Sequence, residues 1–436
     1  MKITKFALTA AIAAACLGGS VRAEAPAGTS ADYDYYSEDA APVVSAETLR
    51  DYSSVIPAAA GCSDAPVSNC DSGCGAGSCD GISGCDGGCD SACGCGPWKL
   101  IDRKILGFEV GGWTQLGYHT YNNTLFNQHA DRIRLQQQWL WAEKKADGRC
   151  GLDFGGRIDY LYGVDAQDTQ AFGILNNHWD NNWDHGIYGH AIPQLYGEVA
   201  MGDLSIKVGH FFTLIGYEVV GATGNFFYSH SYTMYNSEPF THTGVLATYK
   251  MSNDLTVYGG YVMGWDSGFE DNGDAFLGGT SMDLTDLINV TSQYVIGRFG
   301  EAGAQNEVGF MTSTVITTQL SDSMQHVLWI DYLDTDGTGR ARERQTFDVN
   351  NILLIGLTDN VTWGNRFEWY NIDKGVYGVT TGRSDVYAYT TGLNINAGTN
   401  LVFRPEVRWD WDKDRVVGNE LGGSQTTFGM DAILTY

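Results

Sequence analysis

Charged side chains occupy every second position along several segments whose other positions are apolar. In residues 401–412, arginines and carboxylates alternate with leucine, phenylalanine, valine and tryptophan. Because successive side chains of a strand point to opposite faces, such a strand has one charged and one apolar face. A charged face of this kind can line an aqueous path and govern which ions pass. The candidate lining residues are Arg132, Arg134, Asp153, Arg157, Asp159, Glu198, Arg366, Glu368, Arg404, Glu406 and Arg408. The alternative is that these residues form ion pairs that brace the strands.

A second group of candidate residues lies in the connection between residues 214 and 240. It combines carboxylates with a dense aromatic run: Glu218, Phe226, Phe227, Tyr228, His230, Tyr232 and Glu238. Such an aromatic surface is unfavourable in bulk water. We expect this segment to fold inward and narrow the path, and we expect Glu218 or Glu238 to bias passage toward cations. The alternative is an external patch that packs on neighbouring loops or on another protomer.

Signatures of catalysis or metal binding are weak in this chain. The spacing of His178, His185 and His190 fits no helical pair of ligands. Residues 180–191 begin like a calcium-binding loop but lack its glycine and its final glutamate. The chain contains no Gly-x-Ser-x-Gly, phosphate-binding glycine loop or His-Glu-x-x-His. We therefore expect no enzyme activity, no cofactor and no bound metal.

Strands are the elements that must position the charged residues. The chain ends with apolar Phe428, Met430, Ala432, Leu434 and Tyr436 at alternate positions, and the last of them is aromatic. This pattern fits the closing strand of an outer-membrane barrel, although a sandwich edge strand would share it. Residues 150–162, 344–357 and 385–397 alternate in the same way. Together the segments favour an all-β, transmembrane antiparallel barrel over residues 98–436.

Short turns and long connections alternate along the barrel region. With both chain ends in the periplasm, seven long and six short connections predict about 14 strands, and 12 or 16 are alternatives. Residues 266–303 are assigned to one long connection. They include Tyr294-Val-Ile296, which has strand character, but counting that segment alone would make the strand number odd.

The net charge of −26 and the isoelectric point of about 4.5 bear on the partners. Nucleic-acid binding requires a basic surface, so we expect no nucleic-acid partner. A barrel would contact outer-membrane lipid and pass small hydrophilic solutes or ions. The sequence is also compatible with a homo-oligomer.

The region before the barrel indicates export. Residues 1–23 have the basic start, apolar stretch and small-residue cleavage site of a signal peptide. Residues 24–61 are predicted to be a flexible tether rich in alanine, serine, proline and acidic residues. Residues 62–97 form a flexible, cysteine-rich periplasmic segment with too few apolar residues for a core. Its cysteines are Cys62, Cys70, Cys74, Cys79, Cys85, Cys89, Cys93 and Cys95.

Disulfides are the favoured interpretation of these cysteines, and a metal site is the weaker alternative. Removal of the signal peptide also removes Cys16 and leaves nine cysteines, an odd number. Cys150 lies in a predicted short turn on the same side of the barrel. We expect Cys150 to pair with one of the upstream cysteines. Because nine is an odd number, one thiol within 62–95 is then expected to form no disulfide within the chain. The alternative is that Cys150 is a small turn residue.

Several motifs occur in an order that resembles the OmpL-like β-barrel porin family. They are Gly111-Gly-Trp113, the asparagine-rich stretch 122–127, Gln136-Gln-Gln-Trp139 and the aromatic blocks 225–234 and 239–246. The resemblance covers residues 97–436, and the block 225–246 is its most specific part. It implies an outer-membrane barrel with a pore, and it does not extend to the cysteine-rich segment.

Two functions remain open from the sequence. The leading hypothesis is a porin for passive diffusion of small hydrophilic solutes or ions. The second is a structural envelope protein, in which the barrel is an anchor and the cysteine-rich segment cross-links it to periplasmic or other envelope proteins.

Overall fold

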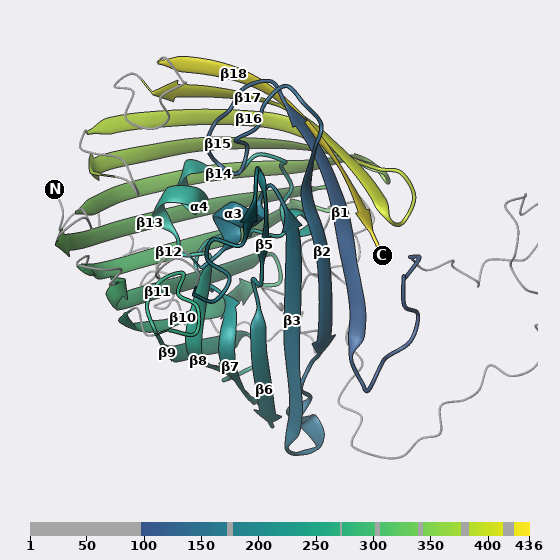
Figure 1. Cartoon of the computed structure of the whole chain (residues 1–436), viewed down its shortest axis with the longest axis vertical. Helices are drawn as coiled ribbons and strands as arrows, with labels where there is room; N and C mark the ends of the chain where they lie inside the picture. Colours follow the sequence, from purple (N-terminus) through teal and green to yellow (C-terminus); the bar gives the residue numbers. More distant parts are fainter. Residues whose placement is uncertain are drawn as a thin grey trace, which may run out of the picture.

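Sixteen antiparallel strands form a closed ring in the computed structural model of the chain (Figure 1). The structure describes residues 97–171, 178–270, 273–300, 306–338, 343–375, 383–412 and 423–436. The ring consists of β1 (Glu109–His119), β2 (Arg134–Lys144), β3 (Asp153–Gly163), β6 (Leu195–Met201), β7 (Leu204–Phe212), β8 (Thr241–Lys250), β9 (Leu255–Val262), β10 (Asp274–Thr285), β11 (Ile288–Gly300), β12 (Asn306–Ser321), β13 (Met324–Thr338), β14 (Arg344–Thr358), β15 (Val361–Lys374), β16 (Ser384–Asn396), β17 (Leu401–Asp412) and β18 (Ser424–Thr435). Two extra strands, β4 (Asp184–His185) and β5 (Tyr188–Ala191), form a short hairpin that pairs with the end of β3.

The ring closes between the last strand and the first. Strand β18 pairs with β1 in a register that runs from Trp113 opposite Thr435 to His119 opposite Gly429. The Gly112 and Tyr436 backbones extend this pairing with N–O distances of 2.9 and 3.0 Å. The side chains of Phe428, Met430 and Leu434 face outward and are exposed, whereas Asp431 and Ile433 point inward and are buried. The expected antiparallel barrel and its closing strand are therefore confirmed.

The predicted number of 14 strands is wrong, and the alternative of 16 is right. The two missing strands are β10 and β11, which lie within the segment 266–303 that the sequence assigned to a loop. Strand β11 includes the Tyr294-Val-Ile296 stretch. Strand β10 was hidden because Gly278 and Gly279 lie at its centre and weaken the alternation. Its register with β9 and β11 is nevertheless regular over most of its length.

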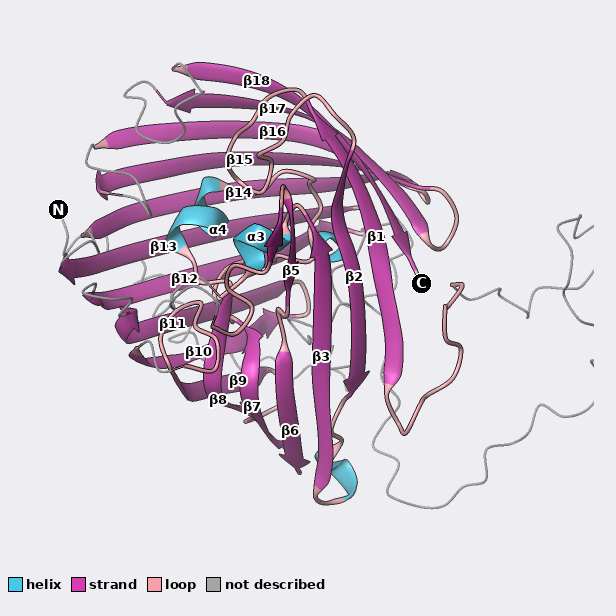
Figure 2. Cartoon of the chain, in the orientation of Figure 1, coloured by secondary structure: helices cyan, strands magenta, loops and turns pink. Residues whose placement is uncertain are grey.

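The two ends of the ring differ in their connections. Short turns join β6 to β7, β8 to β9, β10 to β11, β12 to β13 and β14 to β15, and we call this end the short-turn end. The connections at the other end are mostly longer and contain the short helices α3 (Ala166–Thr169), η2 (Ala222–Gly224) and α4 (Tyr232–Ser237). In Figure 2 the helices α3 and α4 are seen against the interior of the ring. No helix in the described part of the chain is long and apolar enough to cross a membrane.

Part of the interior is apolar, which the sequence did not indicate. Inward-facing side chains of β8 to β13, including Leu246, Leu277 and Met311, form a buried cluster. Leu214 and Ile215 from the connection after β7 pack into the same cluster. The barrel is therefore partly filled by side chains on this side. The polar inward faces are concentrated on the opposite wall, on β14 to β18.

The N-terminal predictions lie largely outside the described residues. These are the signal peptide over 1–23, the tether over 24–61 and the cysteine-rich segment up to residue 96. Cys150 ends the single helical turn η1 (Gly148–Cys150) in the connection between β2 and β3 and is exposed. Its expected pairing with an upstream cysteine remains a prediction.

Candidate functional site

Residues 213–240, between β7 and β8, form a loop that contacts the opposite wall of the barrel. We call this segment the lumen loop. It bonds to inward-facing side chains of β2, β14, β15 and β17. All seven residues of the predicted constriction are buried: Glu218, Phe226, Phe227, Tyr228, His230, Tyr232 and Glu238. The structure thus places the predicted aromatic run inside the barrel, where its rings pack on one another and on the wall.

Two wall carboxylates hold the backbone of the lumen loop. Glu406 on β17 accepts hydrogen bonds from the N–H groups of Tyr228 and Ser229 at 3.0 and 3.1 Å. Glu368 on β15 accepts from Tyr232 and Thr233 at 3.0 and 2.8 Å, and also from the Thr233 hydroxyl at 2.8 Å. Hydrogen bonds to ionised acceptors are stronger than neutral ones. Each carboxylate therefore pins two consecutive residues of the loop.

Two arginines on β17 hold the carbonyl groups of the same loop. Arg404 donates to the Ala222 carbonyl at 2.9 Å, and its Nε donates to Asp431 at 2.9 Å. Arg408 donates to the His230 carbonyl, and its Nε donates to Asp410 at 2.8 Å. Alternate residues of a strand share one face, so these two arginines and Glu406 form a row along the inward face of β17. We call this row, together with Arg366 and Glu368 on β15, the clamp.

Gly364 on β15 provides the space in which the loop is seated. A Cβ atom at this position would lie 2.1 Å from the Phe226 ring. The absence of a side chain at Gly364 thus allows the ring to approach the wall closely. Loop and wall fit each other through packing as well as hydrogen bonds.

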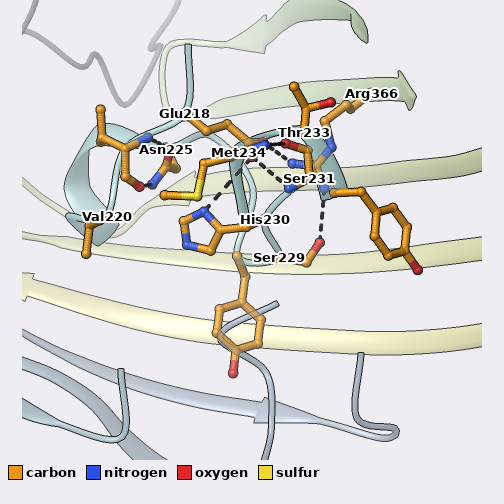
Figure 3. Close-up of polar contacts among 12 residues, drawn as sticks. Glu218, Val220, Asn225, Ser229, His230, Ser231, Thr233, Met234 and Arg366 are labelled. Atoms are coloured by element: carbon orange, nitrogen blue, oxygen red, sulfur yellow. Dashed lines mark hydrogen bonds and ion pairs between the residues drawn. The ribbon is translucent and has the colours of Figure 1, made fainter. Parts of the chain in front are cut away.

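Glu218 forms the ionic contact at the centre of the site (Figure 3). One of its oxygens pairs with the Arg366 guanidinium, and the other accepts from the Ser231 N–H at 2.7 Å. Burial alone would raise the pKa of Glu218, but Arg366, His230 and the Ser231 N–H outweigh it and lower the pKa below its ordinary value. Burial lowers the pKa of His230 to about 4, so this ring is neutral near pH 7. Glu218 is therefore ionised, and Arg366 is its counter-ion.

Glu238 has a different environment from Glu218. Its carboxyl is buried near Asp331 on β13 and Asp348 on β14, which lie directly opposite each other in the sheet. Burial and the neighbouring Asp331 raise the pKa of Glu238 well above its ordinary value. Glu238 is therefore held in the protonated, uncharged form over a wider pH range than an exposed glutamate.

Replacing Glu238 with glutamine is expected to reduce the loss of stability on raising the pH. In the unfolded chain this carboxyl ionises near its ordinary pKa of 4.5, whereas the folded protein keeps the proton to higher pH. The folded state then binds more protons in this range, so stability falls as the pH rises above 4.5 toward the raised pKa. The measurement is the temperature of the heat-induced gel shift between about pH 5 and about pH 9. Glu198→Gln at the short-turn end is the control, and an unchanged pH dependence in Glu238→Gln would refute the assignment.

The predicted lining residues on the strands occupy four different positions. Arg366, Glu368, Arg404, Glu406 and Arg408 form the clamp and are almost fully buried. Arg157 and Asp159 on β3 pair with each other, with an Nε–Oδ1 distance of 2.7 Å. Near the short-turn end, Asp153 pairs with Lys144 and Glu198 accepts from Ser205. At the other end Arg134 is the first residue of β2.

The placement of Arg132 on a strand face is wrong. Arg132 precedes β2 and is an exposed residue of the connection between β1 and β2. The alternation of inward-facing and outward-facing residues does not extend to Arg132, because β2 and its pairing in the sheet begin only at Arg134.

The sequence missed contacts made by neutral side chains of β1 and β2. Gln137 donates to the Val220 carbonyl at 2.8 Å and accepts from the Ala222 N–H at 2.9 Å. Gln136 donates to the Tyr228 hydroxyl, which also lies 3.2 Å from Nδ1 of His119. Both glutamines reach inward although they are adjacent, because the register of β1 and β2 shifts at this point. The run of three glutamines in one strand was the signal that could have revealed this contact.

Comparisons with known proteins agree with this architecture. The chain matches OmpT, an outer membrane protein of Vibrio cholerae, with a TM-score of 0.53 and 11% identity, over 77% of this chain and 100% of that one. It matches the anion-selective porin from Comamonas acidovorans with a TM-score of 0.51 and 10% identity, over 76% and 99% of the two chains. At these identities the likeness concerns the fold alone. None of the curated proteins matches the chain.

Residues 107–436 match the family described as putative beta-barrel porin-2, OmpL-like. The match covers the whole ring of strands and the lumen loop. The chain belongs to this family of OmpL-like β-barrel porins.

Proposed function

We propose that the protein lets small hydrophilic solutes or ions diffuse passively across the outer membrane, without enzymatic chemistry. The observation that carries this proposal is the lumen loop, which is fixed inside a closed ring of strands by polar residues of the wall. A loop in this position narrows the path and decides by size and charge what passes. Because the clamp is almost fully buried, the path runs beside the clamp, and a small conductance is expected.

The interior charge favours cations. Among the described residues, thirteen aspartate and glutamate side chains are buried, against five arginines. Burial raises the pKa of Glu238, so protonation of this residue reduces the excess. An aqueous path through this interior would therefore attract cations and repel anions.

Single-channel recording on the full chain in planar bilayers tests the proposal. We expect small, discrete conductance steps, and a reversal potential in a salt gradient that indicates preference for cations. Folded protein that inserts into the bilayer but gives no steps would refute the transport function. Steps with a preference for anions would refute the charge argument alone.

A structural role in the envelope is the second candidate function. Cys150 lies at the short-turn end, and the strand β1 that follows the cysteine-rich segment also begins there. In outer-membrane barrels the short turns face the periplasm, so we propose that the N-terminal segment is periplasmic. The barrel would then anchor cross-links between the cysteine-rich segment and envelope proteins. High-mass ladders on non-reducing gels, together with an absence of conductance, would favour this function.

A disulfide between Cys150 and one of the upstream cysteines is expected. Closing so long a chain segment would stabilise the fold by about 4 kcal/mol, less any strain. The measurement is alkylation of the denatured, unreduced protein followed by peptide mapping. Quantitative alkylation of Cys150 before reduction would contradict the cross-link.

A further inference from the structure

Residues 97–108 form an ordered segment ahead of β1, which we call the strap. At its start, the Trp98 backbone exchanges two hydrogen bonds with the Asn400 side chain, both of 2.8 Å. The Trp98 ring also packs edge-on against Tyr436, with 6.2 Å between ring centroids. The other end continues into β1. The strap is therefore attached to the short-turn end at both of its ends (Figure 1).

The strap exposes large apolar side chains. Trp98 is 57% exposed, and Leu100 and Ile105 are also exposed. Leu106 is 93% exposed and lies at the tip of a tight turn closed by two backbone bonds between Ile105 and Phe108, of 2.8 and 2.9 Å. The φ angles of Leu106 and Gly107 are 54° and 88°. Left-handed φ values favour glycine or asparagine and are unusual for leucine. The exposed side chain of Leu106 is unfavourable in water and would be favourable in an apolar medium.

Basic side chains accompany this apolar surface. A cavity of 310 Å³ between the strap and the barrel wall is lined by Lys99, Arg103 and Lys104, together with Trp98 and Tyr436. Asp102 and Glu109 line it as well, and Glu109 pairs with Lys104 at 2.9 Å. The cationic groups of Lys99 and Arg103 therefore exceed the remaining carboxylate. This local excess stands out in a chain whose net charge is −26.

We propose that the strap binds anionic phospholipid in the leaflet at the short-turn end. In this arrangement Leu106 enters the acyl region, and Lys99 and Arg103 contact lipid phosphates at the cavity. The strap adjoins β18 and β1, whose outward-facing Leu434 and Leu116 are exposed as on a membrane-facing wall. An amphipathic segment with basic and aromatic residues binds the interface through buried apolar area and attraction to anionic lipid. This attachment is independent of the proposed transport.

The charged half of the proposal is tested with Lys99→Gln/Arg103→Gln in the full chain. Native mass spectrometry measures phosphatidylglycerol retained by the barrel against phosphatidylcholine. Each basic residue near an anionic surface contributes about fivefold, so the double variant should lose about 25-fold in preference for phosphatidylglycerol. Arg298→Gln/Lys374→Gln at the opposite end is the control and should keep the preference. An unchanged preference in the strap variant would overturn the proposal. Displacement of the lipid by inorganic phosphate would overturn it as well, since it would indicate a phosphate site.

The apolar half is tested with Leu106→Asn. Asparagine accepts a positive φ more readily than leucine, so a purely structural role predicts an equally or more stable turn. If Leu106 inserts into lipid, the asparagine variant should instead hold the strap less firmly in a bilayer, because a polar side chain does not favour the acyl region. Amide hydrogen exchange of peptide 97–108, in nanodiscs containing phosphatidylglycerol, should be slow in the natural protein and faster in the variant. Equal exchange in the two proteins would refute insertion.

Discussion

Replacing Glu368 and Glu406 with alanine is expected to raise the single-channel conductance several-fold. The double variant removes the acceptors of four backbone N–H groups of the lumen loop, those of Tyr228, Ser229, Tyr232 and Thr233. Leaving a buried donor unsatisfied costs roughly 1–3 kcal/mol each. Moving the loop away from the wall lets water satisfy these donors, and the same movement widens the path. Conductance in planar bilayers is the measurement.

Two further variants make this experiment specific to the clamp. Glu198→Ala removes a carboxylate at the short-turn end that accepts from Ser205 instead, and it should leave the conductance unchanged. The double glutamine variant keeps an acceptor oxygen at both positions and should lie between the natural protein and the alanine variant. A folded alanine variant with the natural conductance would show that the clamp does not hold the loop in the path.

The sequence predicted the fold because lipid on one side and polar groups on the other impose a strict alternation. The alternation of Phe428, Met430 and Leu434 with inward residues such as Asp431 identified the closing strand correctly. It failed at β10, because Gly278 and Gly279 have no side chains to alternate. It also gave no sign of the apolar cluster inside β8 to β13. That cluster depends on which loop fills the barrel, and strand periodicity holds no information about this.

The candidate site was predictable in its parts but not in its contacts. The inward direction of Arg404, Glu406 and Arg408 follows from their spacing of two residues. Their partners are backbone N–H and carbonyl groups of the lumen loop, and every residue has these groups, so no side-chain pattern reveals them. The aromatic run marked the right segment, because rings of this number require burial. The position of this run against the barrel wall depends on Gly364 and on the register shift at Gln136, and only the three-dimensional structure shows these two features.

Exchanging Glu218 for glutamine is expected to lower both the preference for cations and the stability of the barrel. The substitution removes the carboxylate that forms an ion pair with the buried Arg366 guanidinium. Removing one partner of a buried ion pair destabilises by about 3–5 kcal/mol. The remaining positive charge would repel cations at the loop, so the cation-to-anion permeability ratio should fall several-fold. Glu238→Gln should change this ratio less than Glu218→Gln does, because burial and Asp331 raise the pKa of Glu238 well above its ordinary value and favour its uncharged form.

A double-mutant cycle separates the charge of this pair from its structural role. Arg366→Gln removes the charge that chiefly opposes the effect of burial on the pKa of Glu218, so Glu218 should ionise only at higher pH than in the natural protein. The permeability ratio of this variant should therefore rise above the natural value as the pH is raised, although the variant also destabilises the barrel. The variant with both glutamines has the same net charge as the natural pair, so its permeability ratio should return toward the natural value. Reversal potentials and the temperature of the heat-induced gel shift are measured for all four proteins. If the two single variants shift the reversal potential in the same direction, the loop's shape and not its charge controls selectivity, and the electrostatic account fails.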